Sequence, residues 1–235
     1  MKNLLTIFIL LGGLLINSSC KNAGDKSATA ESAGTDTTQN TILAAPFKVL
    51  AVNHTVKDFD VWKAVYDEGE SGRKASGLST LSIARDMDNP NMIYVFNLMS
   101  DVQKAKDFSA DPALKAAMEK GGVSSAPTIK YMDVSRYEVS PSEFKGRVRI
   151  THTVKDFDAW LKVYDTEGKE ARAANGMIDR ALSRSMDDPN LVTVSFAISD
   201  LNKVKARLND PALKKLMSEA GVVGMPEINF FQAID

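Results

Sequence analysis

One phrase of fifteen residues occurs twice in this chain of 235 residues, and the duplication constrains the fold more than any other feature. The phrase reads NHTVKDFDVWKAVYD at residues 53–67 and THTVKDFDAWLKVYD at residues 151–165. His152 follows His54 at an offset of 98, and after one inserted residue an offset of 99 holds to the end. The match extends over about 90 residues per copy, a period too long for a solenoid repeat. It indicates a small domain duplicated in tandem.

Each copy has the periodicity of a βαββαβ unit. In the first copy, alternating residues 48–55 predict a strand, and Asp58 is suited to cap a helix that ends near Gly77. Residues 79–85 and 92–98 flank the turn sequence DMDNPN and predict a hairpin. Two short helices with aspartate N-caps and a last strand complete the unit, at residues 101–108, 111–122 and 128–134. The second copy repeats this order from Arg147 to about Ala233.

The third strand of the first copy is apolar on both sides. Its alternating residues form two sets, Met92, Tyr94, Phe96 and Leu98 on one side and Ile93 and Val95 on the other. A ferredoxin-like unit carries its helices on one sheet face, so the other face needs a cover. We therefore predict an α+β fold. It consists of two tandem ferredoxin-like βαββαβ units whose antiparallel sheets pack face to face into one intramolecular α+β barrel.

The two copies differ on one face of their strands. Val49 and Ala51 of the first copy correspond to Arg147 and Arg149 of the second. If this face lines the barrel, its interior is apolar on one half and polar on the other, and the buried arginines need acidic partners. The alternative is that the strand edge simply faces water.

The first 46 residues are not expected to belong to the folded units. Residues 1–19 resemble a secretory signal peptide with a short apolar run. The following Cys20 is the only cysteine and lies where a bacterial lipoprotein carries its lipid; the alternative is an ordinary signal peptide cleaved nearby. Residues 20–46 then form a flexible tether, because they are rich in Ala, Ser, Thr, Gly and Asp. Since Lys21 rather than aspartate follows the cysteine, we expect an outer-membrane lipoprotein.

The folded units are expected at residues 47–138 and 145–235, in a monomer that contains an internal pseudo-dimer. The net charge of −1 gives no reason to expect nucleic acid as a partner, because nucleic-acid binding depends on clustered positive charge. Two histidines and one cysteine leave little material for a transition-metal site, so we predict no metal and no cofactor. The expected partners are a membrane, through the lipid anchor, and a small-molecule ligand.

The unit resembles a known family. The βαββαβ order, the HTVKDFD opening followed by tryptophan and the DPALK…M…GV ending are similar to antibiotic biosynthesis monooxygenase-like domains of the dimeric α+β barrel superfamily. The resemblance covers both units and implies that one polypeptide forms the barrel that two chains form elsewhere. It also implies a pocket between sheet and helices, where Asn, Trp, Tyr, His or Arg side chains hold an electron-rich substrate without metal or flavin. Asn53 is replaced by Thr151, so an essential asparagine would be missing from the second copy.

Four pairs of side chains are candidates for ligand contacts, namely His54 and His152, Trp62 and Trp160, Tyr66 and Tyr164, and Arg73 and Arg172. Each histidine is either a base at a pocket mouth or a half-buried side chain that hydrogen-bonds the following turn, and we favour the second interpretation. The tryptophans fit the helix–sheet core and also the wall of a pocket. The arginines fit an anionic ligand through their planar donor fork, or a solvated position over the sheet end.

Three classes of function remain open from the sequence. The first is a binding protein for a small apolar or aromatic molecule, which we favour because the chain shows no catalytic triad, carboxylate pair or phosphate loop. The second is a cofactor-independent monooxygenase or a haem-degrading enzyme, and the third is a structural or interaction protein. A cavity would speak against the third class. A cavity lined by a histidine and a tyrosine of the repeated phrase would favour the second.

Overall fold

The computed structural model describes residues 46–139 and 142–234. The expected signal peptide, Cys20 and the tether up to residue 45 lie outside the described residues. No helix in these two ranges is long and apolar enough to cross a membrane. The first unit consists of the elements β1 (Phe47–Thr55), α1 (Phe59–Glu68), α2 (Glu70–Ala75), β2 (Leu78–Asp86), β3 (Met92–Met99), α3 (Val102–Ser109), α4 (Pro112–Lys120) and β4 (Thr128–Tyr137).

The second unit repeats this order with one difference in its first helix. Its elements are β5 (Gly146–Val154), α5 (Phe157–Ala174), β6 (Met177–Ser185), β7 (Leu191–Ile198), α6 (Leu201–Asn209), α7 (Pro211–Glu219) and β8 (Val222–Ile234). The single helix predicted between Asp58 and Gly77 is divided at Gly69 into α1 and α2. In α5 the corresponding break is a kink at Gly168, whose φ of 78° and ψ of 154° are not helical.

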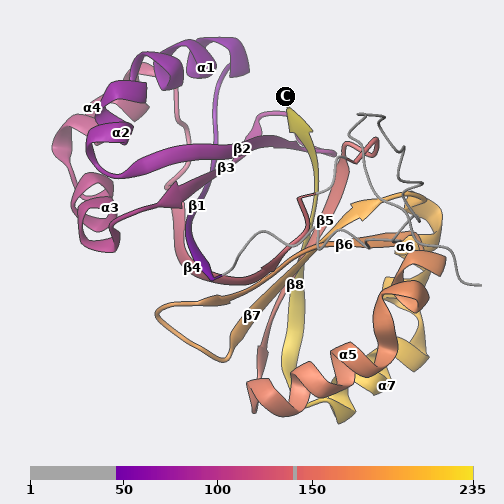
Figure 1. Ribbon diagram of the computed structural model, residues 1–235. Coiled ribbons are helices and arrows are strands. Elements are labelled where there is room, and N and C mark those ends of the chain that lie inside the picture. Colours follow the sequence, from indigo (N-terminus) through magenta and orange to yellow (C-terminus); the bar gives the residue numbers. More distant parts are fainter. Residues whose placement is uncertain (1–45, 140–141, 235) are drawn as a thin grey trace, which may run out of the picture. The chain divides into compact units, whose positions relative to one another are not determined.

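The eight strands form one closed antiparallel ring in the order β1-β3-β2-β8-β5-β7-β6-β4 (Figure 1). The ring closes because β2 pairs with β8 and β4 pairs with β6, so hydrogen bonds join the two units at both sheet edges. The α+β fold class and the intramolecular barrel are confirmed. The expectation of sheets that only face each other is incomplete, since edge pairing also joins them.

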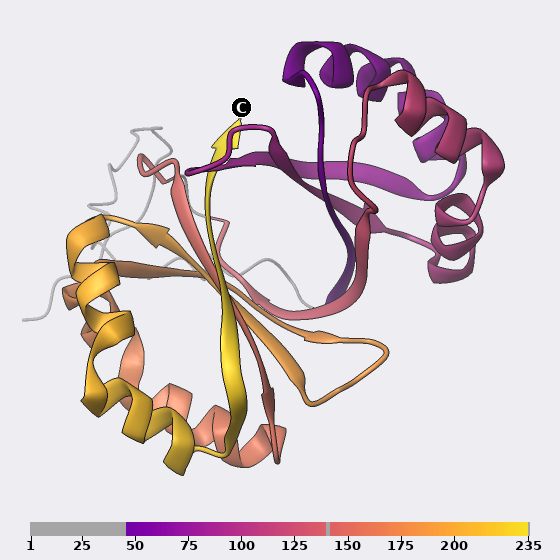
Figure 2. The same cartoon turned by 180° about the vertical axis from the view of Figure 1, so that it is seen from behind.

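Two apolar layers lie on the two sides of this ring. Ile93 and Val95 face the helices of the first unit, where they pack with Trp62. On the other side of the strands, Val49 and Ala51 pack with side chains of β4 in the lumen of the ring. Figures 1 and 2 show the helices of each unit outside its own strands. The predicted burial of both strand faces is therefore confirmed.

Capping side chains and glycines fix the local geometry of the helices as the sequence predicts. Asp58 accepts a hydrogen bond from the backbone N–H of Val61, and Asp156 caps α5 in the same way. Gly77 and Gly176 follow the helices with φ of 72° and 81°. At either glycine a Cβ would lie 2.6 Å from an oxygen of the loop ahead of the next helix, so only glycine fits there.

Candidate functional site

The repeated phrase builds the same aromatic stack in both units. In the second unit, the ring of Trp160 lies 5.4 Å from that of His152 and 5.2 Å from that of Tyr164, centroid to centroid. The corresponding distances around Trp62 are 5.7 Å to His54 and 5.1 Å to Tyr66. Both tryptophans are buried, and offset contacts of this kind stabilise a core beyond simple area burial. Packing alone therefore explains why the phrase occurs twice.

Buried arginines extend each stack. The guanidinium of Arg73 lies 3.6 Å from the ring centroid of Tyr66, and that of Arg172 lies 3.9 Å from the ring centroid of Tyr164. Arg73 also donates to the carbonyl oxygen of Tyr66, at the end of α1. The arginines are 7% and 4% exposed, so the predicted solvated position over the sheet end is wrong. Each one stacks on a tyrosine. Arg172 also joins α5 to β6 through Asp179.

The two histidines are buried more completely than predicted. His54 is 3% exposed and His152 is 5% exposed. None of their ring nitrogens has a hydrogen-bond partner among the described residues, so the predicted hydrogen bond to the following turn is wrong. Burial lowers the pKa of each imidazole from 6.5 to about 4. Both rings are therefore neutral near pH 7.

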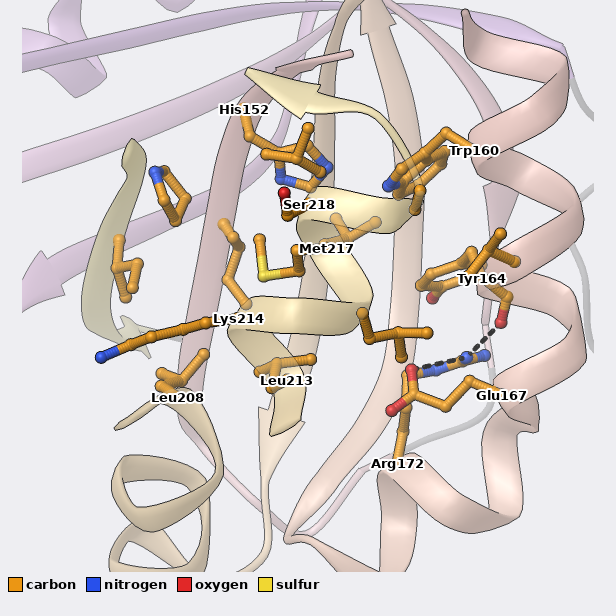
Figure 3. Close-up of a pocket in the computed structure, with 18 of the residues that line it drawn as sticks. His152, Trp160, Tyr164, Glu167, Arg172, Leu208, Leu213, Lys214, Met217 and Ser218 are labelled. Carbon is orange, nitrogen blue, oxygen red and sulfur yellow. Dashed lines mark hydrogen bonds and ion pairs between the residues drawn. The ribbon is translucent and has the colours of Figure 1, made fainter. Parts of the chain in front are cut away.

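A cavity of about 670 Å³ lies between α5, α7 and the strands of the second unit (Figure 3). Trp160 and Tyr164 form one wall from α5, and Leu213 and Met217 face them from α7. Most of the lining is apolar, and its further members include Ile150, Val163, Met177, Val194, Phe196, Leu208, Leu216, Ala220, Val222, Met225 and Ile228. Pockets of this size and composition are typical of sites for small organic molecules.

The helices of the first unit are closer together in the corresponding region. α1 packs directly against α4, and a Cβ at Gly121 would lie 3.5 Å from both Trp62 and Val65. Lys120 of α4 also bridges Glu68 of α1 at 2.7 Å. In the second unit the position of Lys120 is occupied by an acidic residue, Glu219, which cannot form that bridge. The second unit therefore lacks this bridge, and its cavity lies between the corresponding helices, α5 and α7.

A network of charged side chains lies at one end of the cavity (Figure 3). Arg172 binds Asp179 through two hydrogen bonds of 2.8 and 2.6 Å, and Tyr164 donates to the same carboxylate at 3.3 Å. Glu167 lies between Arg172 at 3.7 Å and Arg207 at 2.8 Å. Burial and the Asp179 carboxylate raise the pKa of the Tyr164 hydroxyl, so the phenol stays protonated. Glu167 and Arg172 line the cavity directly.

Sequence reasoning missed three members of this network. Asp179 stands at the position of Thr80 and Arg207 at the position of Phe108, whereas Glu167 corresponds to Glu68 and directly follows the inserted residue. In the first unit Tyr66 instead shares hydrogen bonds with Thr80 at 2.8 Å and with Asn97 at 3.1 Å. The signal that could have found the network is the pair of charged residues, Asp179 and Arg207, that replace uncharged residues in the second copy.

The remaining candidates differ in how they relate to the cavity. In the second unit His152, Trp160, Tyr164 and Arg172 all line it, so the structure brings these four predicted residues together. His54, Trp62, Tyr66 and Arg73 are joined in the equivalent stack of the first unit, where α4 packs against α1. Within the described part of the chain, no group of three or more His, Cys, Asp or Glu side chains is arranged to hold a metal ion.

No family model and no curated protein matches the sequence. Solved structures do share the fold. An anthrone oxidase-like protein has 14% identity and a TM-score of 0.57, with 83% of this chain and 94% of the other covered. A candidate monooxygenase of Fusobacterium nucleatum has 12% identity and a TM-score of 0.54, with 82% and 94% covered. A heme-binding protein of Thermus thermophilus has 12% identity and a TM-score of 0.50, with 83% and 94% covered.

At such low identities the likeness concerns the fold. It shows that the chain shares its α+β fold with a candidate monooxygenase and with an anthrone oxidase-like protein, as the sequence resemblance implied for the fold.

Proposed function

We propose that the chain binds a small, largely apolar or aromatic molecule in the helix–sheet cavity of the second unit. The observation that carries this proposal is the cavity of about 670 Å³, walled by the stack of His152, Trp160 and Tyr164 and by apolar side chains of α7. The charged side chains at one end of it are engaged with one another, because Arg172 pairs with Asp179, and Arg207 pairs with Glu167 and Asp210. Since most of the lining is apolar, a neutral ligand with one polar group suits the cavity better than an ion.

Cofactor-independent oxygenation is the second candidate function, because His152 and Tyr164 both line the cavity and the fold neighbours include an anthrone oxidase-like protein. Two features make oxygenation a weaker candidate than ligand binding. Both nitrogens of His152 are buried rather than open to the cavity, and the Tyr164 hydroxyl is engaged with Asp179. Oxygen uptake in the presence of anthrone tests this candidate. If the wild-type protein takes up oxygen faster than the uncatalysed reaction and His152→Phe does not, oxygenation becomes the preferred function.

Haem degradation is supported only by the likeness to a heme-binding protein, and His152 as it stands presents no nitrogen to a haem iron. A purely structural or interaction role, the third class considered from the sequence, is disfavoured by the cavity, since packed cores leave few voids larger than a water molecule.

A pair of matched substitutions tests ligand binding in the cavity. Leu213→Trp fills the space from α7, and Leu114→Trp places the same side chain at the equivalent position of α4. N-phenyl-1-naphthylamine is a suitable probe because it is neutral, aromatic and fluorescent in apolar surroundings. We expect saturable probe binding by the wild-type protein and by Leu114→Trp, and loss of binding in Leu213→Trp. Equal loss in both variants, or binding by neither the wild type nor the control, contradicts the proposal.

We further propose that the protein acts in the bacterial envelope as an outer-membrane lipoprotein. The support is the lone Cys20 at the end of a signal-like apolar segment, followed by Lys21. Cys20→Ser is then expected to release the protein from membranes into the soluble envelope fraction. A variant that still sediments with membranes after a high-salt wash would rule the lipid anchor out.

Mass spectrometry of molecules that co-purify with the native protein identifies the ligand of the cavity in the second unit.

A further inference from the structure

A second cavity of about 170 Å³ lies in the lumen of the strand ring, away from the helices. Its two halves differ in chemistry. The first unit contributes mainly apolar side chains, among them Val49, Phe96 and Met132, whereas the second contributes hydroxyl and guanidinium groups. The face that carries Arg147 and Arg149 thus lines the lumen, which settles the alternative that the sequence left open. No carboxylate occurs among the described residues that line this cavity.

Arg149 is the buried charge of this lumen. It is 6% exposed and stands where the first unit has Ala51. One of its terminal nitrogens donates to the side-chain oxygen of Asn229 at 3.0 Å, and its Nε has no hydrogen-bond partner among the described residues. The nearest carboxylate is that of Glu227, at 4.0 Å. The guanidinium also lies 5.3 Å from the ring centroid of Tyr94 and 5.8 Å from that of Phe96. No carboxylate approaches it closely, so a further anionic group would stabilise its buried charge.

Glu227 and Lys130 form an ion pair of 3.0 Å at one mouth of the lumen. Lys130 belongs to β4 and Glu227 to β8, which stand opposite each other in the order of the ring. The ion pair therefore spans the opening. Half of the Glu227 side chain is exposed, whereas only 22% of the Lys130 side chain is. Glu227 is thus the partner that can turn outward and leave Lys130 and Arg149 without their nearest carboxylate.

Hydroxyl groups add hydrogen-bond donors to the polar half. Thr151 and Thr193 lie 3.0 Å apart, oxygen to oxygen, and both are buried. A single hydrogen bond between two hydroxyls uses only one of their hydrogens, so the second remains for a ligand.

We propose that the lumen of the strand ring binds a small organic anion, with its carboxylate between Arg149 and Lys130 and its compact apolar body against Val49, Phe96 and Met132. Glu227 occupies the carboxylate position at the edge of the site when no ligand is bound, and it turns outward when the ligand enters. The volume of the lumen suits a ligand of about one ring, well below the size of the molecules that fill typical pockets of 300–1,000 Å³. This site is separate from the helix–sheet cavity and does not rest on the function proposed for it.

Benzoate is the probe, and benzamide is its neutral isostere. We expect benzoate to raise the melting temperature of the purified protein in a saturable manner, while benzamide at the same concentrations does not. Arg149→Ala, which restores the residue of the first unit, should weaken benzoate binding roughly tenfold or more, because hydrogen bonds between charged groups are the strong ones. Arg149→Met serves the same purpose if the alanine variant does not fold.

Two further variants distinguish binding in the lumen from binding elsewhere on the protein. Glu227→Gln removes the competing carboxylate and should tighten benzoate binding severalfold. Leu213→Trp fills the helix–sheet cavity and should leave the benzoate response unchanged. The proposal is overturned if benzamide acts like benzoate, if Leu213→Trp rather than Arg149→Ala abolishes the response, or if neither the wild type nor Glu227→Gln responds. Equal binding of inorganic phosphate would also overturn it, because the lumen would then hold an adventitious ion only.

Discussion

Acidification from pH 7 to pH 5 should destabilise this protein through its two buried histidines. Each imidazole is held in the folded state at a pKa of about 4 by burial, against 6.5 in a model peptide. Between these values the unfolded chain binds protons that the folded protein does not, so the free energy of unfolding falls as the pH falls. The loss is complete below about pH 4. At pH 5 it amounts to roughly 2 kcal/mol for each histidine relative to pH 7.

Urea unfolding at fixed pH values measures this loss. The carboxyl groups of Asp165 and Glu227 have pKa values below their ordinary range, so their contributions vanish at lower pH than this window. The control is the double variant His54→Phe and His152→Phe, which keeps an aromatic ring on each tryptophan. We expect its stability to be almost constant between pH 7 and pH 5. A wild-type protein whose stability does not change in that window, or a double variant that keeps the full slope, would refute the reasoning.

The remaining predictions concern stability and assembly, and urea unfolding or size-exclusion chromatography checks them. Gly176→Ala should lower the free energy of unfolding by about 3 kcal/mol or more, since its φ is 81° and the new Cβ would lie 2.6 Å from a backbone oxygen. Gly72→Ala lies in a helix with open space around it, so it should leave the free energy of unfolding unchanged or raise it. Arg172→Met should lower the free energy of unfolding by about 3–5 kcal/mol, because it leaves the carboxylates of Asp179 and Glu167 without their cation at a partly buried site. A fragment of residues 41–140 exposes the edges of β2 and β4, so it should dimerise or aggregate, and a soluble folded monomer would contradict the closed ring.

The duplication predicted most of the fold because it fixes an architecture rather than single contacts. Two copies of a unit with an uncovered apolar sheet face can bury that face against each other, and the apolar character of both sides of residues 92–98 required it. Aspartate caps and the positive-φ glycine at Gly77 were readable from local chemistry alone. Edge pairing between units was not, because it depends on the register of β2 with β8, which no local pattern encodes.

The candidate site could be predicted only in part. The repeated residues of the phrase were found, but repetition cannot tell which copy holds a cavity. That depends on differences between the copies, such as Glu219 in place of Lys120, Asp179 in place of Thr80 and the non-helical backbone at Gly168. The histidines were expected near solvent because imidazole usually finds a hydrogen-bond partner. Instead, each imidazole is buried in the core, where it makes a tilted ring contact with Trp62 or Trp160.

The presence of one tryptophan in each unit allows the most direct test of ligand binding in the second unit. Trp62→Phe leaves Trp160, which lines the cavity, as the only tryptophan, and Trp160→Phe leaves Trp62 beneath the closed helices of the first unit. Titration with N-phenyl-1-naphthylamine, followed by the loss of tryptophan emission through energy transfer, compares the two proteins. We predict strong, saturable quenching of Trp160 with much weaker quenching of Trp62. Equal quenching of the two, or stronger quenching of Trp62, would contradict the assignment of the ligand to the second unit.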